Sequence, residues 1–264
     1  MFDLNSTLQG IFIIISIVIM AIAFIGWFEE KENNNLLNST THKNRGNPSE
    51  LALVKTLLKK GIHPDAIFHD LYLQKRNGTF SQIDVVVATA VGLIVIEVKD
   101  YSGWIFGSGD NQNWTQVLAY GREKYRMYNP VIQNRRHIEA LRKLSPQFAT
   151  IPMFNVVVFY GECEIKELSN IPREARVIYS NQIHEVIDHI TQNYPKAQYS
   201  NKREIVSELS KAKMNGDITE VKESHVENVT AYVGNKSSRI TPQYDINPIS
   251  RSVRKTLRWL RNLR

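Results

Sequence analysis

Two acids and a lysine stand inside apolar stretches of the chain, where a charged side chain is costly to bury. Asp84 lies within residues 83–87, and Glu97 follows thirteen positions later, two residues before Lys99, within residues 93–99. A charge in such a stretch is expensive unless it is paired or bound to a metal ion. If both stretches are β-strands, Glu97 and Lys99 point to the same face of the sheet, because side chains alternate between faces.

Metal-assisted chemistry is what this set of side chains suits. If the two strands pair, Asp84 and Glu97 converge at one end of the sheet. With a backbone carbonyl such as that of Val98, they form the oxygen-rich site that Mg²⁺ prefers. The ammonium of Lys99 can then orient or deprotonate a water molecule, or stabilise charge on a phosphate. The alternative is a buried or edge ion pair between Lys99 and one acid. A single acid in a strand favours that ion pair, whereas the three residues together favour the metal site.

The elements that must position these residues are expected in the order α-β-β-β-α-β. Apolar residues recur at helical spacing after Pro48, which opens the first helix, and Gly61 ends it. Asn129 and Pro130 form a good N-cap and first turn for a second helix. The strands and the later helices are expected at residues 66–73, 82–88, 93–99, 129–144, 154–160, 176–179 and 182–192. The first three strands can form an antiparallel meander, and the glycine-containing residues 103–112 are expected to be a loop.

This arrangement resembles that of a known group of nucleases. An Asp on one strand and Glu-x-Lys on the next, within an α-β-β-β-α-β core, resemble the PD-(D/E)xK superfamily, and the fuller pattern resembles the nuclease-related domain, NERD. The matching stretches within residues 46–144 are Gly46-x-x-x-Glu50, residues 82–87 and 92–99, Gly103-Trp104-Ile105-Phe106-Gly107, Trp114, and Asn129-Pro130-Val131-Ile132-Gln133. The resemblance implies a restriction-endonuclease-like α/β fold with a mixed central sheet flanked by helices.

The resemblance also implies a role for each matching polar residue. Asp84 and Glu97 would bind Mg²⁺ or Mn²⁺, and Lys99 would be the catalytic base or an electrostatic stabiliser. Glu50 would be the first-helix acid that assists the metal. Gln133 would orient the site or the substrate.

The candidate residues in the two expected helices can also be interpreted without the family resemblance. Glu50 lies in the first helical turn, where an acid interacts favourably with the helix dipole. Gln133 and His137 are four residues apart, so they share a helix face and both could point inward. For His137 taken alone, a surface or packed histidine is favoured over a catalytic one.

The N-terminal residues predict a membrane anchor. Residues 11–28 form an uncharged, mostly apolar run of eighteen residues, which as a helix spans about 27 Å at about 1.5 Å per residue. A cleaved signal peptide is the alternative, but no Lys or Arg precedes the run as a signal peptide requires. Because Lys31, Lys43 and Arg45 follow the run, we expect the N-terminus outside and the bulk of the chain in the cytoplasm. Residues 11–28 would then contact the lipid bilayer in a single pass.

The distribution of charge points to the C-terminal tail, and the cysteine content excludes two kinds of site. The net charge is +7, but the last fourteen residues hold six Lys or Arg and no acid, so most of the excess belongs to this tail. A helix expected at residues 251–264 gathers five basic side chains on one side: Arg251, Arg254, Lys255, Arg258 and Arg261. It would contact an anionic membrane surface or nucleic acid, or else dock its apolar face on its own domain. The single cysteine, Cys163, excludes a disulfide framework and a cysteine-based zinc site.

We therefore predict five regions: a transmembrane helix, a polar linker, a NERD nuclease-like domain, a polar C-terminal region of unclear fold, and the basic helix. They correspond to residues 11–28, 29–45, 46–193, 194–250 and 251–264, with a further helix near residues 202–214. The predicted function is that of a membrane-anchored, Mg²⁺- or Mn²⁺-dependent nuclease that hydrolyses phosphodiester bonds at the cytoplasmic face, with DNA favoured over RNA. The alternative is a non-catalytic nucleic-acid-binding or membrane-associated adaptor that retains the nuclease fold.

Overall fold

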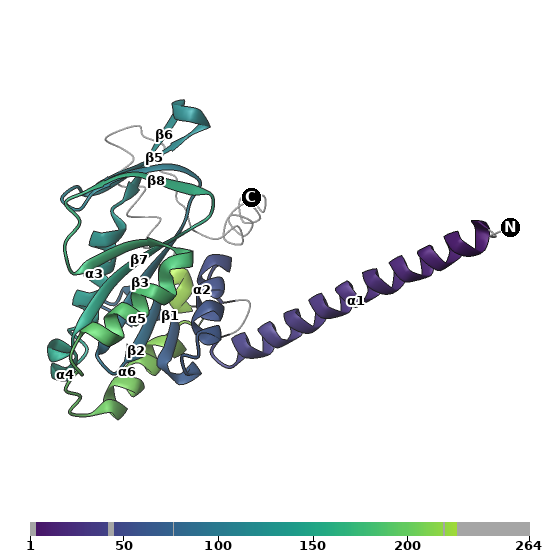
Figure 1. Ribbon diagram of the computed structural model, residues 1–264. Helices are drawn as coiled ribbons and strands as arrows, with labels where there is room; N and C mark the ends of the chain where they lie inside the picture. The colour runs from purple at the N-terminus through teal and green to yellow at the C-terminus, as the bar shows by residue number, and fades with distance from the viewer. Residues whose placement is uncertain (1–3, 42–44, 76, 219, 226–264) are drawn as a thin grey trace, which may run out of the picture.

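A computed structural model describes residues 4–41, 45–75, 77–218 and 220–225 (Figure 1). The basic helix expected at residues 251–264 lies outside these ranges. The helices are α1 (Leu4–Asn38), α2 (Pro48–Lys59), α3 (Pro130–Leu141), α4 (Pro146–Thr150), α5 (Ile183–Asn193) and α6 (Lys202–Asn215), with 3-10 turns η1 (Pro64–Ala66), η2 (Ala119–Gly121) and η3 (Ser180–Gln182). The strands are β1 (Ile67–Gln74), β2 (Phe80–Thr89), β3 (Gly92–Asp100), β4 (Gly103–Ser108), β5 (Asn113–Leu118), β6 (Glu123–Tyr128), β7 (Met153–Tyr160), β8 (Cys163–Ser169) and β9 (Ala175–Tyr179).

A mixed sheet of strand order β1-β2-β3-β7-β9 forms the centre of the domain. Strands β1, β2 and β3 pair antiparallel, as the sequence predicts, whereas β3, β7 and β9 run parallel to one another. The chain order α2, β1, β2, β3, α3, β7 confirms the α-β-β-β-α-β core and the mixed α/β fold.

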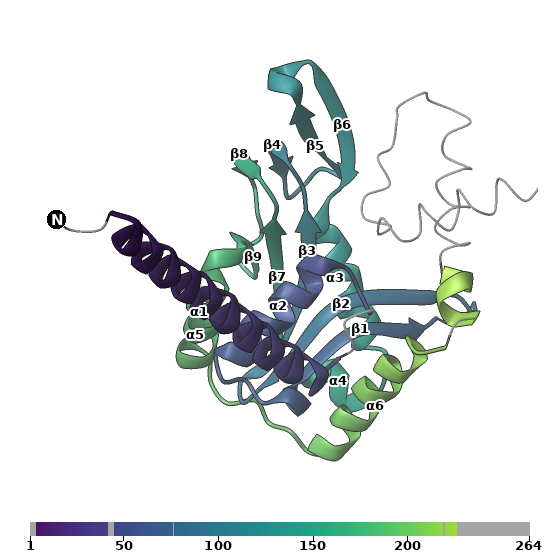
Figure 2. The same cartoon turned by 90° about the vertical axis from the view of Figure 1, so that its right-hand side faces the viewer.

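Helices cover both faces of this sheet (Figure 2). On one face, the core contains side chains of α2, of α5 and of the end of α1, among them Leu37, Leu53, Leu57, Ile183 and Ile187. On the other face, α3, α4 and α6 contribute a second cluster that includes Ile138, Leu141, Phe148, Ile205 and Leu209. The strands of this sheet are therefore apolar on both sides. A charged residue within them is withdrawn from water on whichever face it lies.

Residues 103–112, predicted to be a loop, instead contain β4, so that prediction was wrong. β4 lies in a second sheet of order β6-β5-β4-β8, paired antiparallel with β5 and parallel with β8. The glycines that suggested a loop serve packing, because a Cβ atom at Gly107 would overlap the indole of Trp114. Trp114 is buried, donates its Nε1–H to the Ser108 carbonyl at 2.9 Å, and stacks on Phe159. The second sheet is thereby anchored to β7 of the first.

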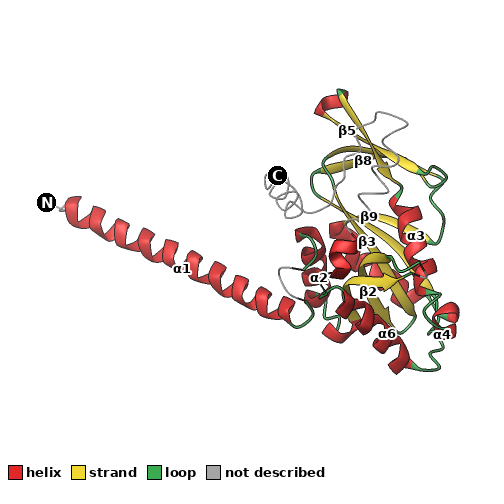
Figure 3. Cartoon of the chain, turned by 180° about the vertical axis from the view of Figure 1, so that it is seen from behind, coloured by secondary structure: helices red, strands yellow, loops and turns green. Residues whose placement is uncertain are grey.

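Helix α1 projects from the domain as one long rod (Figure 3). Its side chains from Phe12 to Phe28 are exposed, and among the described residues α1 is the helix that is long and apolar enough to cross a membrane. The helix does not stop where the linker was expected but continues through residues 29–38. Packing explains the difference, since Leu37 is buried in the same cluster as α2.

The helix expected near residues 202–214 forms as α6 and packs on the domain. Ile205, Leu209 and Ala212 are buried in the cluster that includes Phe68 and Leu71 of β1. Part of the region expected to have no clear fold thus contributes to the core beyond residue 193.

Arg45 joins the start of the domain to β1 and to the end of α6. Its side chain is buried and forms ion pairs with Asp70, at 3.2 Å, and with Asp217, at 2.7 Å. Its guanidinium also donates to the carbonyls of Asp70 and Lys213. Asp70 has a positive φ of 55° and interrupts the pairing of β1 with β2. The arginine therefore compensates a buried carboxylate on a strained residue.

We expect Arg45→Ala to lower the free energy of unfolding by about 3–5 kcal/mol, because the carboxylate of Asp70 would stay buried without its main partner. Arg203, exposed on α6, supplies the matched control, and Arg203→Ala should change stability by less than about 0.5 kcal/mol. Denaturant unfolding of the full chain in detergent measures both changes. Equal stability of the two variants would contradict the role assigned to Arg45.

Candidate active site

Strands β2 and β3 bring Asp84 and Glu97 close together. Val85 and Ile96 are the last paired residues at this end of the ladder, and Asp84 and Glu97 are the next residues of their strands. The regular pairs end at this point, and the Val98 N–H donates to Asp84 Oδ2 at 2.8 Å. The carboxylate therefore joins the strands where the backbone ladder stops.

Glu97 and Lys99 form a buried ion pair on β3. They are 1% and 5% exposed, and Lys99 Nζ lies 2.5 Å from Glu97 Oε1. Gln133 of α3 accepts a second hydrogen bond from Nζ through its Oε1 atom, 3.1 Å away. Three of the predicted site residues are thus in direct contact on the side of the sheet that faces α3.

A histidine that the sequence favours as a surface or packed residue also meets Glu97. His137 is buried, and its Nε2 lies 3.2 Å from Glu97 Oε2, within ion-pair distance. Its Nδ1 contacts Ser81 Oγ at 3.2 Å. The sequence signal was its position one helical turn after Gln133.

Asn129 holds α3 against the site. This residue is fully buried, and its Nδ2 donates to the carbonyls of Ser108, at 3.0 Å, and Asn111, at 2.8 Å. Its Oδ1 accepts the Val131 N–H at 2.9 Å and so caps the helix. The Asn-Pro pair therefore ties the first turn of α3 to the β4–β5 connection and determines where Gln133 lies.

Glu50 enters from the first turn of α2. It is buried, accepts a hydrogen bond from the Asn47 amide, and has Oε2 3.2 Å from His69 Nε2. His69 Nδ1 contacts Thr41 Oγ1 at 2.8 Å. Gly46 has a φ of 72°, and a Cβ atom there would overlap both Glu50 Oε2 and the ring of His69. The glycine in the Gly46-x-x-x-Glu50 stretch thus makes room for the pair.

Burial and mutual repulsion raise the pKa of two carboxyl groups in the site. Burial, with repulsion from Asp70 and Glu97, raises the pKa of Glu50 to about 8. Burial, with repulsion from Glu97 and Glu50, raises the pKa of Asp84 well above its usual range. Burial lowers the pKa of His69 to about 4. Near neutral pH, Glu50 and His69 are therefore a hydrogen-bonded pair of neutral groups rather than an ion pair.

The pair of Glu97 and Lys99 is charged. Burial acts to raise the pKa of Glu97, but attraction to Lys99 and to His137 outweighs it and lowers that pKa. Burial likewise acts to lower the pKa of Lys99, but Glu97, Tyr101 and Asp84 outweigh it and raise that pKa. Lys99 is therefore an ammonium at neutral pH, which suits an electrostatic stabiliser better than a base.

The chemistry of Asp84 and Glu97 fits a divalent cation. Glu97 Oε2 is buried with no hydrogen bond to any residue that the structure describes. The pKa values of Asp84 and Glu50 are raised first by burial and then by neighbouring carboxylates, and the positive charge of a dication would favour the ionised form of both groups. Within the described ranges, no three His, Cys, Asp or Glu side chains gather as metal ligands. Further ligands would therefore be backbone carbonyls and waters, as Mg²⁺ accepts.

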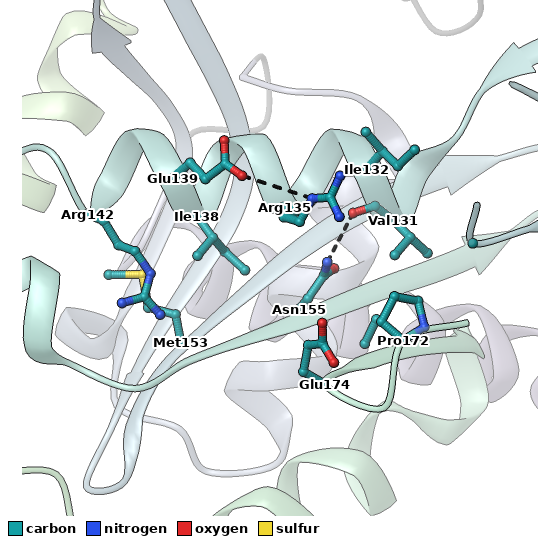
Figure 4. A pocket seen from close by; sticks show the side chains of 12 residues that line it. Val131, Ile132, Arg135, Ile138, Glu139, Arg142, Met153, Asn155, Pro172 and Glu174 are labelled. Atoms are coloured by element: carbon teal, nitrogen blue, oxygen red, sulfur yellow. Dashed lines mark hydrogen bonds and ion pairs between the residues drawn. The ribbon is translucent and has the colours of Figure 1, made fainter. Parts of the chain in front are cut away.

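A separate pocket lies beside α3 and is lined by none of the five predicted catalytic residues (Figure 4). It lies between α3, β7 and the β8–β9 connection, and its charged side chains are Arg135, Glu139, Arg142 and Glu174. The five basic residues predicted in the tail lie beyond the described residues, so they are not placed relative to the site.

The polar side chains that support Glu50 were not predicted from the sequence. His69 and Asp70 are consecutive polar residues inside the otherwise apolar β1, which was the available signal. Asn47 precedes a helix that starts with Pro48, and its Oδ1 accepts the Glu50 N–H at 2.9 Å as an N-cap.

Comparisons with known proteins identify the family of the chain. The family described as the nuclease-related domain, NERD, matches residues 45–160. A protein of Bacillus anthracis that is described as uncharacterised is 31% identical over 160 residues, which make up 60% of this chain and 73% of the relative. No solved structure matches the chain. The chain belongs to the family of proteins that carry a nuclease-related domain, NERD.

Proposed function

We propose that this chain is a metal-dependent nuclease that hydrolyses phosphodiester bonds of nucleic acid, with DNA favoured over RNA. The observation that carries the proposal is the contact of Lys99 with Glu97 and Gln133, directly beside Asp84, in a chain with a nuclease-related domain. These side chains come from strands β2 and β3 and from helix α3.

The charges of the side chains suggest how they divide the work. Lys99 is held as an ammonium by Glu97 and Gln133, so it would stabilise negative charge that develops on a phosphate. Glu50, with a pKa of about 8, is mostly protonated at neutral pH in the metal-free protein. A dication bound nearby would favour its ionised form, which could then receive a proton from an attacking water. Gln133 would position Lys99 rather than touch the substrate.

Asp84 and Glu97 would hold Mg²⁺ or Mn²⁺. A bound dication would supply Lewis-acid stabilisation of the phosphate and lower the pKa of a bound water. The protein side chains provide the dry, preorganised surroundings, since Glu97, Lys99 and Glu50 are all buried.

A membrane anchor at the cytoplasmic face is part of the proposal. The exposed apolar residues 12–28 of α1 support an anchor, because such a surface is unfavourable in water. Lys31, Lys43 and Arg45 follow the apolar run, and by the positive-inside rule they support a cytoplasmic location of the domain.

The rival is a non-catalytic adaptor that keeps the fold and binds nucleic acid. What favours it is that the two acids are not joined by a third His, Cys, Asp or Glu ligand within the described residues. The two functions differ in whether phosphodiester bonds are cut.

Lys99→Met should reduce cleavage of duplex DNA by at least about a hundredfold, because it removes the positive charge placed at the developing oxyanion. Asp84→Asn should also abolish most activity, although an amide oxygen can still accept the Val98 N–H. Cleavage is measured with the full chain in detergent, with Mg²⁺ and with Mn²⁺, on DNA and RNA substrates.

Lys211→Met is the control, since Lys211 is exposed on α6 and forms an ion pair with Glu208 on the same helix. No cleavage of any substrate by the unaltered chain, with binding unchanged in both site variants, would support the adaptor and refute the enzyme.

Glu50→Gln should stabilise the metal-free protein at alkaline pH. Folding raises the Glu50 pKa from 4.5 to about 8, so its favourable effect is complete below pH 4.5 and is lost as the pH rises through 8. Glutamine carries no such penalty. Above about pH 8 the variant should therefore exceed the wild type by a few kcal/mol, since each pKa unit corresponds to about 1.4 kcal/mol.

Thermal unfolding in EDTA from about pH 5 to about pH 9 measures this difference, which should shrink toward pH 5. Added Mn²⁺ should raise the melting temperature of the wild type more than that of the variant. A difference that does not depend on pH would mean that Glu50 is not titrating as described.

A further inference from the structure

The hairpin of β5 and β6 extends away from the body of the domain (Figures 1 and 2). Its strands pair from Asn113 with Tyr128 to Leu118 with Glu123, and η2 forms the tip. Tyr120 at this tip is 97% exposed and has a left-handed φ of 55°. A large aromatic ring held in water on a constrained turn is a feature that packing of this chain does not explain.

Basic side chains line one face of this hairpin. Arg122, Lys124 and Arg126 are exposed. Lys124 and Arg126 occupy alternate positions of β6, so their side chains lie on the same side of the ribbon, and Arg122 directly precedes the strand. The opposite side carries Glu123, which accepts a hydrogen bond from Tyr125 Oη at 2.7 Å. In the part of the chain that the structure describes, none of the three basic side chains lies within ion-pair distance of an acid. The basic face is available to an anionic partner.

The basic face leads to the candidate active site. Tyr128 at the end of β6 lies under the guanidinium of Arg136, 5.2 Å from the ring centroid. Arg136 is exposed on α3, three residues after Gln133, so the two are neighbours on the helix surface. Gln133 contacts Lys99. Exposed positive charge therefore continues from the hairpin to the helix that supplies the site.

We propose that the β5–β6 hairpin grips double-stranded DNA and directs one strand to the candidate active site; this rests on the proposed nuclease function. Arg122, Lys124 and Arg126 contact backbone phosphates, which fix the register of a duplex. Tyr120 enters the groove at the tip.

The two-stranded shape of the hairpin favours duplex DNA over duplex RNA as the partner. The major groove of B-form DNA, about 12 Å wide, admits a two-stranded ribbon, whereas the deep and narrow major groove of A-form RNA does not. A lipid surface fits less well, because α1 and the hairpin leave the domain in different directions (Figures 1 and 3). A membrane that contains α1 is thus not the surface that the hairpin meets.

The test measures binding without chemistry. The full chain in phosphatidylcholine nanodiscs, with EDTA present, is titrated into fluorescent duplex DNA, duplex RNA, single-stranded DNA, and vesicles rich in phosphatidylserine. The combined change Arg122→Gln, Lys124→Gln and Arg126→Gln should weaken duplex DNA binding at least about tenfold and lower the salt slope by about one for each residue. Tyr120→Asn, which tolerates the positive φ, should weaken binding several-fold without altering the salt slope.

The matched control removes the same charge elsewhere. Lys202→Gln, Arg203→Gln and Lys211→Gln change three exposed basic residues on α6, at the other end of the domain from the hairpin. This control should bind duplex DNA within about twofold of the wild type. Because all of the changed side chains are exposed, the melting temperatures should also stay within a few degrees of the wild type, which separates a binding defect from misfolding.

Three results would overturn the proposal: hairpin variants that lose no more affinity than the α6 control, duplex RNA bound as tightly as duplex DNA, or a hairpin effect seen with anionic vesicles alone. Failure of the proposed nuclease would look different, since a chain that cuts nothing can still show the hairpin-dependent binding. If the chain does cut DNA, the hairpin variants should raise KM with little change in kcat, the reverse of Lys99→Met.

Discussion

On the central strand β3, the charges of Glu97 and Lys99 are both withdrawn from water, so neighbouring groups must compensate each of them. The compensation is uneven. Lys99 is met by Glu97 and by Gln133, whereas the second oxygen of Glu97 faces His137 without a hydrogen bond. Helix α3 must therefore hold a defined position and rotation relative to β3, so that Gln133 reaches Lys99. The N-cap residue Asn129 fixes this position through its hydrogen bonds to Ser108 and Val131. The second sheet serves the same end, because it carries the carbonyls that the cap binds.

Three carboxyl groups near one another cannot all be ionised at low cost in a poorly solvated site. The fold resolves this by leaving Glu97 charged against Lys99 and by pairing Glu50, as a neutral acid, with neutral His69. Asp84 is stabilised in part by the Val98 N–H. Entry of a divalent cation would then be linked to release of protons, so affinity for the cation would rise with pH through the range in which Glu50 titrates.

The core strands and the helices that flank them could be predicted because each is long, apolar and bounded by turn or cap residues, as with residues 93–99 and with Asn129 before α3. The placement of Glu97 and Lys99 on one face followed from alternation alone. The strands β4, β5, β6 and β8 were missed because their side chains are mixed and half-exposed, and glycines such as Gly107 are explained only by a ring brought from another strand. Two further contacts, between Arg45 and Asp70 and between Glu50 and His69, join segments that are distant in the sequence. Such contacts cannot be predicted from local sequence patterns.

Helix α1 runs without interruption from its apolar segment to Leu37, which is packed in the domain core. With residues 12–28 in a bilayer, the ten residues from 29 to 38 would act as a stiff post about 15 Å tall rather than a tether. A domain on such a post cannot tumble freely; it turns about the post and drifts with the lipid. Encounters with a long polymer would then take place at a set height above the membrane and from a limited range of approach angles.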